Sequence, residues 1–124
     1  MKIKKRSDVP SWETPGYPAV GKQVVLGPED GSQEIVLRYF TVATGGSTPY
    51  HSHDFPHLVK IERGRGVAVD AEMEEEALSA GDYVYVPSGE VHCFKNTGTD
   101  ALEFICIVPL RGEQAGSVAS GVTP

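Results

Sequence analysis

Glycine and proline divide this chain into short segments, and their spacing limits the folds open to it more than any other feature. There are 14 glycines and 9 prolines among 124 residues. The segments between them are rich in β-branched and aromatic residues, and a turn sequence such as Pro87-Ser88-Gly89 follows each one. This spacing is typical of all-β sandwiches and barrels. We predict strands at residues 33–43, 57–62, 67–70, 83–86, 91–95 and 101–108.

Two of the breaks have the composition of tight turns. Residues 63–66 read Arg-Gly-Arg-Gly, and residues 96–100 read Asn-Thr-Gly-Thr-Asp. Asn and Gly adopt positive φ readily, as the short loops of β-hairpins require. We therefore expect one hairpin to join 57–62 to 67–70 and another to join 91–95 to 101–108.

The length of the chain allows one domain with its own core and not two. The Pro-rich segment 1–19 is interpreted as an N-terminal arm, in which Trp12 and Tyr17 anchor it to a neighbouring strand or subunit. Residues 20–110 are expected to form the barrel. Residues 111–124 are small and polar, and such a composition would be disordered on its own as a C-terminal tail.

Charge and cysteine content narrow the class of protein. The formal net charge is −6, from 11 basic and 17 acidic residues, which argues against binding to nucleic acid or to an anionic membrane. No stretch approaches the roughly 18 apolar residues of a membrane span. Cys93 and Cys106 would point to opposite faces of the second hairpin, so we expect two free thiols in a reducing compartment. The cytoplasm is therefore the expected location.

All four histidines of the chain fall in two short windows. His51, His53 and His57 lie within seven residues, and His92 follows 35 residues after His57. Side chains alternate along an extended strand, so the spacing of two puts His51 and His53 on one face. Imidazole is the commonest metal ligand in proteins. A fold that closes these strands around one interior would bring the four rings together.

The glycines and prolines around the histidines resemble the two motifs of the cupin superfamily. The first is formed by Gly45, His51, His53, His57 and Gly64. The second has Gly81, Pro87, Gly89, His92 and Asn96 at every fixed position, so the two motifs together span residues 45–96. The commonest form of the first motif has Glu as its third ligand, and His57 takes that place here. The run HSHDFPH is similar to small one-domain cupins with four-histidine sites, some of which hold manganese.

The resemblance implies a single antiparallel jelly-roll β-barrel with one divalent metal on His51, His53, His57 and His92, and it implies a homodimer. Four neutral histidines add no negative charge, which disfavours Mg²⁺ and Ca²⁺. Manganese is favoured, with Fe, Co, Ni, Cu or Zn as alternatives. An octahedral ion with four protein ligands keeps two positions open, as in a catalytic site.

Strand alternation also predicts a pocket wall beside the metal. If His92 faces inward, so does Phe94, and on the last strand Phe104, Cys106 and Val108 share one phase. We assign these four residues to the wall of a mostly apolar substrate pocket, with ordinary core packing as the alternative. Cys106 is read as a buried inert thiol in preference to a reactive one.

Arg38 interrupts an otherwise apolar strand, and a buried guanidinium needs a partner. Three interpretations remain open: it binds a substrate carboxylate, it pairs with a structural Glu or Asp, or its head reaches solvent. We place Arg38 in the candidate pocket.

Three functions fit these residues. The first is a dioxygenase-like oxidoreductase that acts on a small, partly apolar organic substrate at the metal. The second is a non-oxidative isomerase or lyase, in which the metal polarises a carbonyl. It ranks lower because the sequence shows no inward carboxylate to act as a base. The third is a non-catalytic ligand-binding barrel. The fold alone does not choose among them, since one fold hosts many chemistries.

Overall fold

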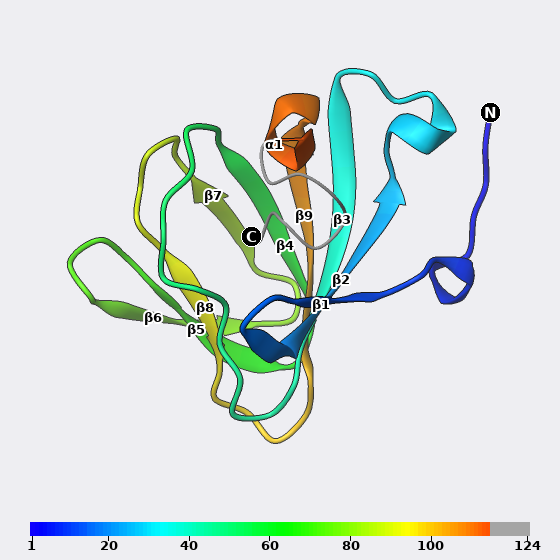
Figure 1. Cartoon of the computed structure of the whole chain (residues 1–124). Helices are drawn as coiled ribbons and strands as arrows, with labels where there is room; N and C mark the ends of the chain where they lie inside the picture. The colour runs from blue at the N-terminus through cyan, green and yellow to red at the C-terminus, as the bar shows by residue number, and fades with distance from the viewer. Residues whose placement is uncertain (115–124) are drawn as a thin grey trace.

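The computed structural model describes residues 1–114 and shows two facing antiparallel sheets that form a jelly-roll barrel (Figure 1). The larger sheet has the strand order β1-β2-β3-β9-β4-β7, and the smaller has β6-β5-β8. The strands are β1 (Trp12–Thr14), β2 (Tyr17–Leu26), β3 (Ile35–Val42), β4 (His57–Arg63), β5 (Arg65–Val69), β6 (Glu75–Ser79), β7 (Tyr83–Val86), β8 (Cys93–Asn96) and β9 (Leu102–Pro109). The predicted all-β jelly roll is confirmed.

Helical structure is confined to short pieces. Two 3₁₀ turns, η1 (Arg6–Asp8) and η2 (Pro28–Asp30), lie near the N-terminus, and α1 (Leu110–Gln114) follows β9. In this part of the chain no helix is long and apolar enough to cross a membrane. The expected tail begins inside α1, and its residues from 115 onward lie outside the described residues.

The expected hairpin around Gly64 is wrong. Strand β4 pairs with β7 and β9 in the large sheet, whereas β5 pairs with β6 and β8 in the small one. The chain therefore passes from one sheet to the other at Gly64, where φ is +86° and an added Cβ would collide with the carbonyl of Ala101. A turn sequence fixes local backbone angles, but it does not fix which strand the next segment pairs with.

The second expected hairpin is wrong for the same reason. Strand β8 pairs with β5, and β9 pairs with β3 and β4. The Asn96 amide holds the crossing, because its Nδ2 donates to the carbonyls of Val42 (2.9 Å) and Asp100 (2.8 Å). Cys93 and Cys106 consequently lie in different sheets, and both are free and buried.

The two sheets pack through alternating inward side chains, as strand geometry requires. A row of three aromatic rings joins the layers. The ring centroids of Phe40 and Phe104 are 5.4 Å apart, and those of Phe104 and Phe94 are 5.0 Å apart. All three side chains are fully buried. This row fills the middle of the barrel and leaves the end beneath α1 for polar side chains.

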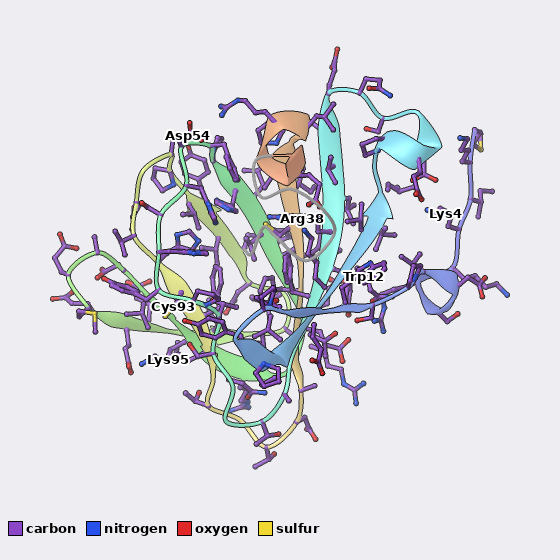
Figure 2. The ribbon with its side chains drawn as sticks, in the orientation of Figure 1. Lys4, Trp12, Arg38, Asp54, Cys93 and Lys95 are labelled. Carbon is purple, nitrogen blue, oxygen red and sulfur yellow. The ribbon has the colours of Figure 1, made fainter. Side chains whose placement is uncertain are left out.

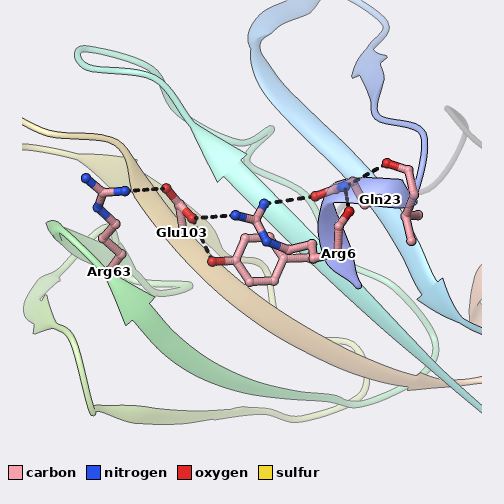
Figure 3. Close-up of polar contacts among 6 residues, drawn as sticks. Arg6, Gln23, Arg63 and Glu103 are labelled. Atoms are coloured by element: carbon pink, nitrogen blue, oxygen red, sulfur yellow. Dashed lines mark hydrogen bonds and ion pairs between the residues drawn. The ribbon is translucent and has the colours of Figure 1, made fainter. Parts of the chain in front are cut away.

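The expected N-terminal arm is partly sheet, because residues 12–14 form β1 and residues 17–19 begin β2, whereas Arg6 lies against the side chains of Gln23, Tyr39 and Glu103 on the large sheet (Figure 3). Arg6 donates to the Gln23 side chain at 3.1 Å and lies 3.7 Å from Glu103, and its guanidinium stacks 4.1 Å from the Tyr39 ring centroid. Tyr39 donates to Glu103 at 2.6 Å. Burial and this carboxylate raise the pKa of Tyr39 to about 12. The contacts cover Glu103, which sits in an otherwise apolar strand.

Gly66 offers a direct test of how closely β5 packs against β8 in its own sheet and against the start of β9 in the facing sheet. It is buried in β5, and a Cβ there would stand against the carbonyl oxygen of Lys95 and 2.9 Å from Leu102 Cδ2. We expect Gly66→Ala to lower the free energy of unfolding by about 2–3 kcal/mol, because backbone would have to move. Chemical denaturation measures it.

Gly21→Ala is the matched control. Its Cβ would lie 3.1 Å from the rotatable Ser11 hydroxyl and at an ordinary contact distance of 3.9 Å from the carbonyl oxygen of Thr41. The cost should therefore stay within about 1 kcal/mol. Equal losses for the two variants would contradict the close contact between β5 and the segments that contain Lys95 and Leu102.

Candidate metal centre

Backbone hydrogen bonds hold the two histidine windows side by side. His51 and His92 exchange both backbone hydrogen bonds, at 3.2 and 3.0 Å, so their side chains share one face of the paired segments. The amide of Gly89 donates to the carbonyl of His53 at 2.7 Å. His57 begins β4 and pairs with Val86. The structure therefore brings together all four histidines that the sequence singled out.

The four imidazole rings form one cluster. Ring centroids are 4.4 Å apart for His51–His53, 5.1 Å for His53–His57 and 5.0 Å for His57–His92. The His51–His92 and His53–His92 separations are both 6.1 Å. Nitrogens about 2.1 Å from a shared ion put ring centroids about 4.5 Å apart at right angles and about 6.5 Å apart in line. The observed spacings fall within or close to this range.

Hydrogen bonding selects the nitrogen that His92 can offer. Its Nδ1 lies 2.9 Å from the carbonyl of Glu90, and because a carbonyl only accepts, Nδ1 carries the proton. The lone pair is then on Nε2, which is buried and has no hydrogen-bond partner among residues 1–114. A second interaction of this kind commonly fixes the tautomer of a metal-ligating histidine.

His57 is the most deeply buried of the four. Its side chain is 1% exposed, and neither ring nitrogen has a hydrogen-bond partner within the described part of the chain. Burial, followed by the charges of His92, Arg38, His53 and His51, lowers the pKa of His57 to about 3. The ring is neutral at physiological pH and keeps a free lone pair. A buried polar atom without a hydrogen-bond partner is costly. The two ring nitrogens of His57 therefore call for a partner that the described residues do not supply.

The four imidazole rings lie close together, but they are not arranged as the ligands of a metal ion. Among the described residues, no three His, Cys, Asp or Glu side chains stand in the arrangement of a metal site. Proximity of the rings is thus a property of the fold, and holding an ion requires the imidazoles to turn about their side-chain torsions.

A cavity of about 250 Å³ reaches the cluster, and both His92 and Phe94 line it. The ring centroids of these two residues are 5.9 Å apart. Four acidic residues also line the cavity, namely Asp70, Glu74, Glu76 and Glu90. Phe104, Cys106 and Val108 lie deeper in the barrel, and each is at most 1% exposed. Phe104 packs against Phe40 and Phe94 within the core.

Arg38 is fully buried beneath α1 (Figure 2). Its Nη1 lies 3.6 Å from Glu113 Oε1, and its Nη2 donates to Cys106 Sγ at 3.1 Å. Lys22, which is 1% exposed, lies 2.8 Å from Glu113 Oε2. Of the three interpretations of Arg38, the structure supports the second, in which the guanidinium pairs with a carboxylate of the chain, here that of Glu113.

Sequence reasoning missed two members of this group. Val20, Lys22 and Val24 lie two residues apart along β2, so strand alternation puts Lys22 on the same face as the two valines. This spacing could have predicted an inward lysine. Glu113 carried no such signal, because its segment was expected to be a disordered tail. The statement that no carboxylate faces the interior is therefore wrong.

Three comparisons with known proteins agree on the fold. The cupin domain family model matches residues 38–108, which contain all four histidines. The polyketide cyclase RemF of Streptomyces resistomycificus has a TM-score of 0.82 at 27% identity, over 89% of this chain and 80% of that chain. A cupin-2 domain protein of Rhodospirillum rubrum has a TM-score of 0.71 at 28% identity, over 88% of this chain and 74% of that chain.

A curated sequence relative is a 1-methylthio-D-xylulose 5-phosphate methylsulfurylase of Rhodospirillum rubrum. It is 36% identical over 72 residues, which make up 58% of this chain and 46% of the relative. The chain spans about half the length of the curated relatives it matches. The family model alone covers more than half of the chain, on a jelly-roll barrel with both motifs in place, and the chain therefore belongs to the cupin domain family.

Proposed function

We propose that this protein is a metal-dependent enzyme that holds one divalent transition-metal ion on His51, His53, His57 and His92. One observation carries the proposal: both ring nitrogens of His57 and the Nε2 of His92 are buried without a hydrogen-bond partner among residues 1–114, inside a cluster of four imidazole rings. A cation supplies the partner that these lone pairs lack. Manganese is favoured by the likeness to four-histidine cupins, with Fe, Co, Ni, Cu and Zn as alternatives.

The donor set suits a transition metal. Imidazole nitrogens bind Mn, Fe, Co, Ni, Cu and Zn well, whereas Mg²⁺ and Ca²⁺ prefer oxygen. When bound, such an ion supplies Lewis acidity and open coordination positions for a substrate or dioxygen. The Glu90 carbonyl orients His92, burial keeps His57 neutral, and Phe94 forms an apolar wall of the adjoining cavity.

The reaction that we favour is a dioxygenase-like oxidation of a small, partly apolar organic molecule. The cavity beside His92 has room for such a molecule, at about 250 Å³. The carboxylate of Glu113, inside the barrel, is held by Lys22 and Arg38 and does not line this cavity. The preference for oxidation rests on the coordination positions that four protein ligands leave open on the ion.

A second candidate is a non-oxidative cyclisation or isomerisation, which the likeness to the polyketide cyclase RemF favours. The two are separated by measuring O₂ uptake of metal-loaded protein with small phenols, enols and diketones, then repeating the incubations without oxygen. Product formation only in air supports the oxidoreductase. Product formation without O₂ supports the cyclase or isomerase, and no turnover in either condition supports a binding protein.

The metal proposal predicts about one divalent transition-metal ion per chain by elemental analysis. His92→Ala should lose most of that metal, because it removes the nitrogen that Glu90 orients. Lys95→Ala is the matched control, since Lys95 lies on β8 three residues after His92 and makes its ion pair with Glu75 on the surface. Full occupancy in His92→Ala would rule out a four-histidine centre.

His57 separates stability from metal binding. In metal-free protein its two ring nitrogens are buried and unsatisfied, so His57→Leu should raise the melting temperature by about 3 °C or more. The same change should abolish the rise in melting temperature that Mn²⁺ gives the wild-type protein. Differential scanning calorimetry with and without Mn²⁺ measures both effects. An equal Mn²⁺ shift in the two proteins would exclude His57 as a ligand.

A further inference from the structure

Three charged side chains meet inside the barrel beneath α1, and their charges do not balance. Lys22 and Arg38 are 1% and 0% exposed, and the Glu113 side chain is 11% exposed. Counted over residues 1–114, two cations and one carboxylate leave one positive charge in excess. A buried charge that lacks partners is unfavourable. The three side chains would therefore be stabilised by a second anion, or by a carboxylate that lies closer to the cations.

Arg38 shows where the deficit lies. Its Nε and Nη1 have no hydrogen-bond partner among the described residues, and neither does Glu113 Oε1. The 3.6 Å between Nη1 and Oε1 is an ion-pair distance, too long for a hydrogen bond. The third nitrogen, Nη2, donates to the Cys106 sulfur, a weak acceptor. Nε and Nη1 face different sides of the guanidinium, so each remains as a single donor that an anion could accept from.

The cations share their interior with the histidine cluster. On the inner face of the large sheet, Arg38 pairs with Cys106 on β9, and Cys106 pairs with Val59 on β4, two residues from His57. The charge of Arg38 contributes to the lowered pKa of His57. The surroundings are otherwise apolar, with the Phe40 ring centroid 5.1 Å from the guanidinium carbon. A molecule that reaches Arg38 would thus contact hydrocarbon as well as charge.

Glu113 reaches the cations from a short element that is separate from both sheets. Helix α1 has five residues, and Gly112 packs so closely on Phe55 that a Cβ would lie 2.8 Å from its ring. Phe55 in turn stacks on His53, with ring centroids 4.9 Å apart. Arg111 donates to the carbonyl of Asp54, at the rim of the barrel (Figure 2). Helix α1 therefore covers both the loop that carries His53 and the buried side chains of Lys22 and Arg38.

Glu113 also faces outward. It lines a cavity of about 500 Å³ whose wall includes Trp12, Val24 and Glu29. The carboxylate thus stands between this cavity and the two buried cations. Withdrawing it would open Lys22 and Arg38 to a small molecule arriving through the cavity.

We propose that Lys22 and Arg38 form a subsite for an organic carboxylate, and that Glu113 occupies this subsite as an internal ligand until a substrate carboxylate displaces it. The proposal rests on the function proposed above, because it names the substrate class: a small organic acid with an apolar body. The unpartnered Arg38 donors bind the carboxylate, and the neighbouring aromatic rings contact the rest of the molecule.

Chemical rescue of Glu113→Gln tests the subsite in full-length, EDTA-treated protein. The variant leaves two cations without a carboxylate, so its melting temperature should fall by about 4 °C or more. Millimolar benzoate should restore most of the loss, whereas benzamide, a neutral molecule of the same shape, should not. Inorganic phosphate, which has the charge but no apolar body, should also fail. Glu29→Gln, on the same cavity wall, should show neither the loss nor the rescue.

Binding to the wild-type protein gives an independent readout. Benzoate should bind Glu113→Gln at least about tenfold more tightly than it binds the wild type, because the internal carboxylate no longer competes. Adding Arg38→Met should remove that gain. Rescue by benzamide, equal rescue by phosphate, or equal affinity for the two proteins would each overturn the carboxylate subsite.

The failure of this proposal is distinguishable from failure of the metal centre, because every readout above uses metal-free protein. Benzoate rescue, together with no metal in the elemental analysis, would uphold the subsite and refute the metal centre. Metal in the elemental analysis without benzoate rescue would uphold the metal centre and refute the subsite. If both hold, Mn²⁺ in the loaded protein should broaden the NMR signals of bound benzoate, since the two sites share one interior.

Discussion

The burial of imidazole and cationic side chains at one end of an apolar barrel is the constraint on which the rest of this structure depends. Inward alternation along β3, β4 and β9 puts Arg38 and His57 on the same face as Phe40 and Phe104. The apolar rows gain free energy by leaving water, and the polar groups lose it. Several of these buried nitrogens have no hydrogen-bond partner in the described part of the chain, and such departures from the rules of packing concentrate at functional sites.

Two groups of nitrogens without hydrogen-bond partners among residues 1–114 share this interior, and they need partners of opposite charge. The lone pairs of His57 and His92 suit a cation, whereas the free donors of Arg38 suit an anion. A metal ion and a substrate carboxylate would satisfy both at once, and each would lower the cost of binding the other. Helix α1 touches both regions, through Phe55 on the histidine side and through Glu113 on the cation side.

The cupin fold explains how the histidines meet but leaves the chemistry open. Proteins similar to this chain include one named as a polyketide cyclase, which has the same fold, and one named as a methylsulfurylase, which matches over 72 residues. What distinguishes this chain is the imidazole of His57 at the position where the commonest motif has a carboxylate. If the proposed metal centre forms, a neutral His57 would leave the full charge of the ion uncompensated, and this would strengthen its attraction for an anion.

The sequence alone located β3, β4, β5, β7, β8 and β9, because alternation of apolar residues and turn chemistry act over a few neighbouring residues, but it missed β1, β2 and β6. It also singled out all four histidines by their spacing, although His51 makes only an isolated bridge and His53 lies in the loop before β4. Tertiary structure decided the rest. Whether a chain turns back beside the strand it left, or crosses to the facing sheet as at Gly64 and Asn96, depends on which pairing buries the most apolar surface across the whole barrel. The meeting of Lys22, Arg38 and Glu113 depends on contacts up to 91 residues apart, which no local pattern encodes.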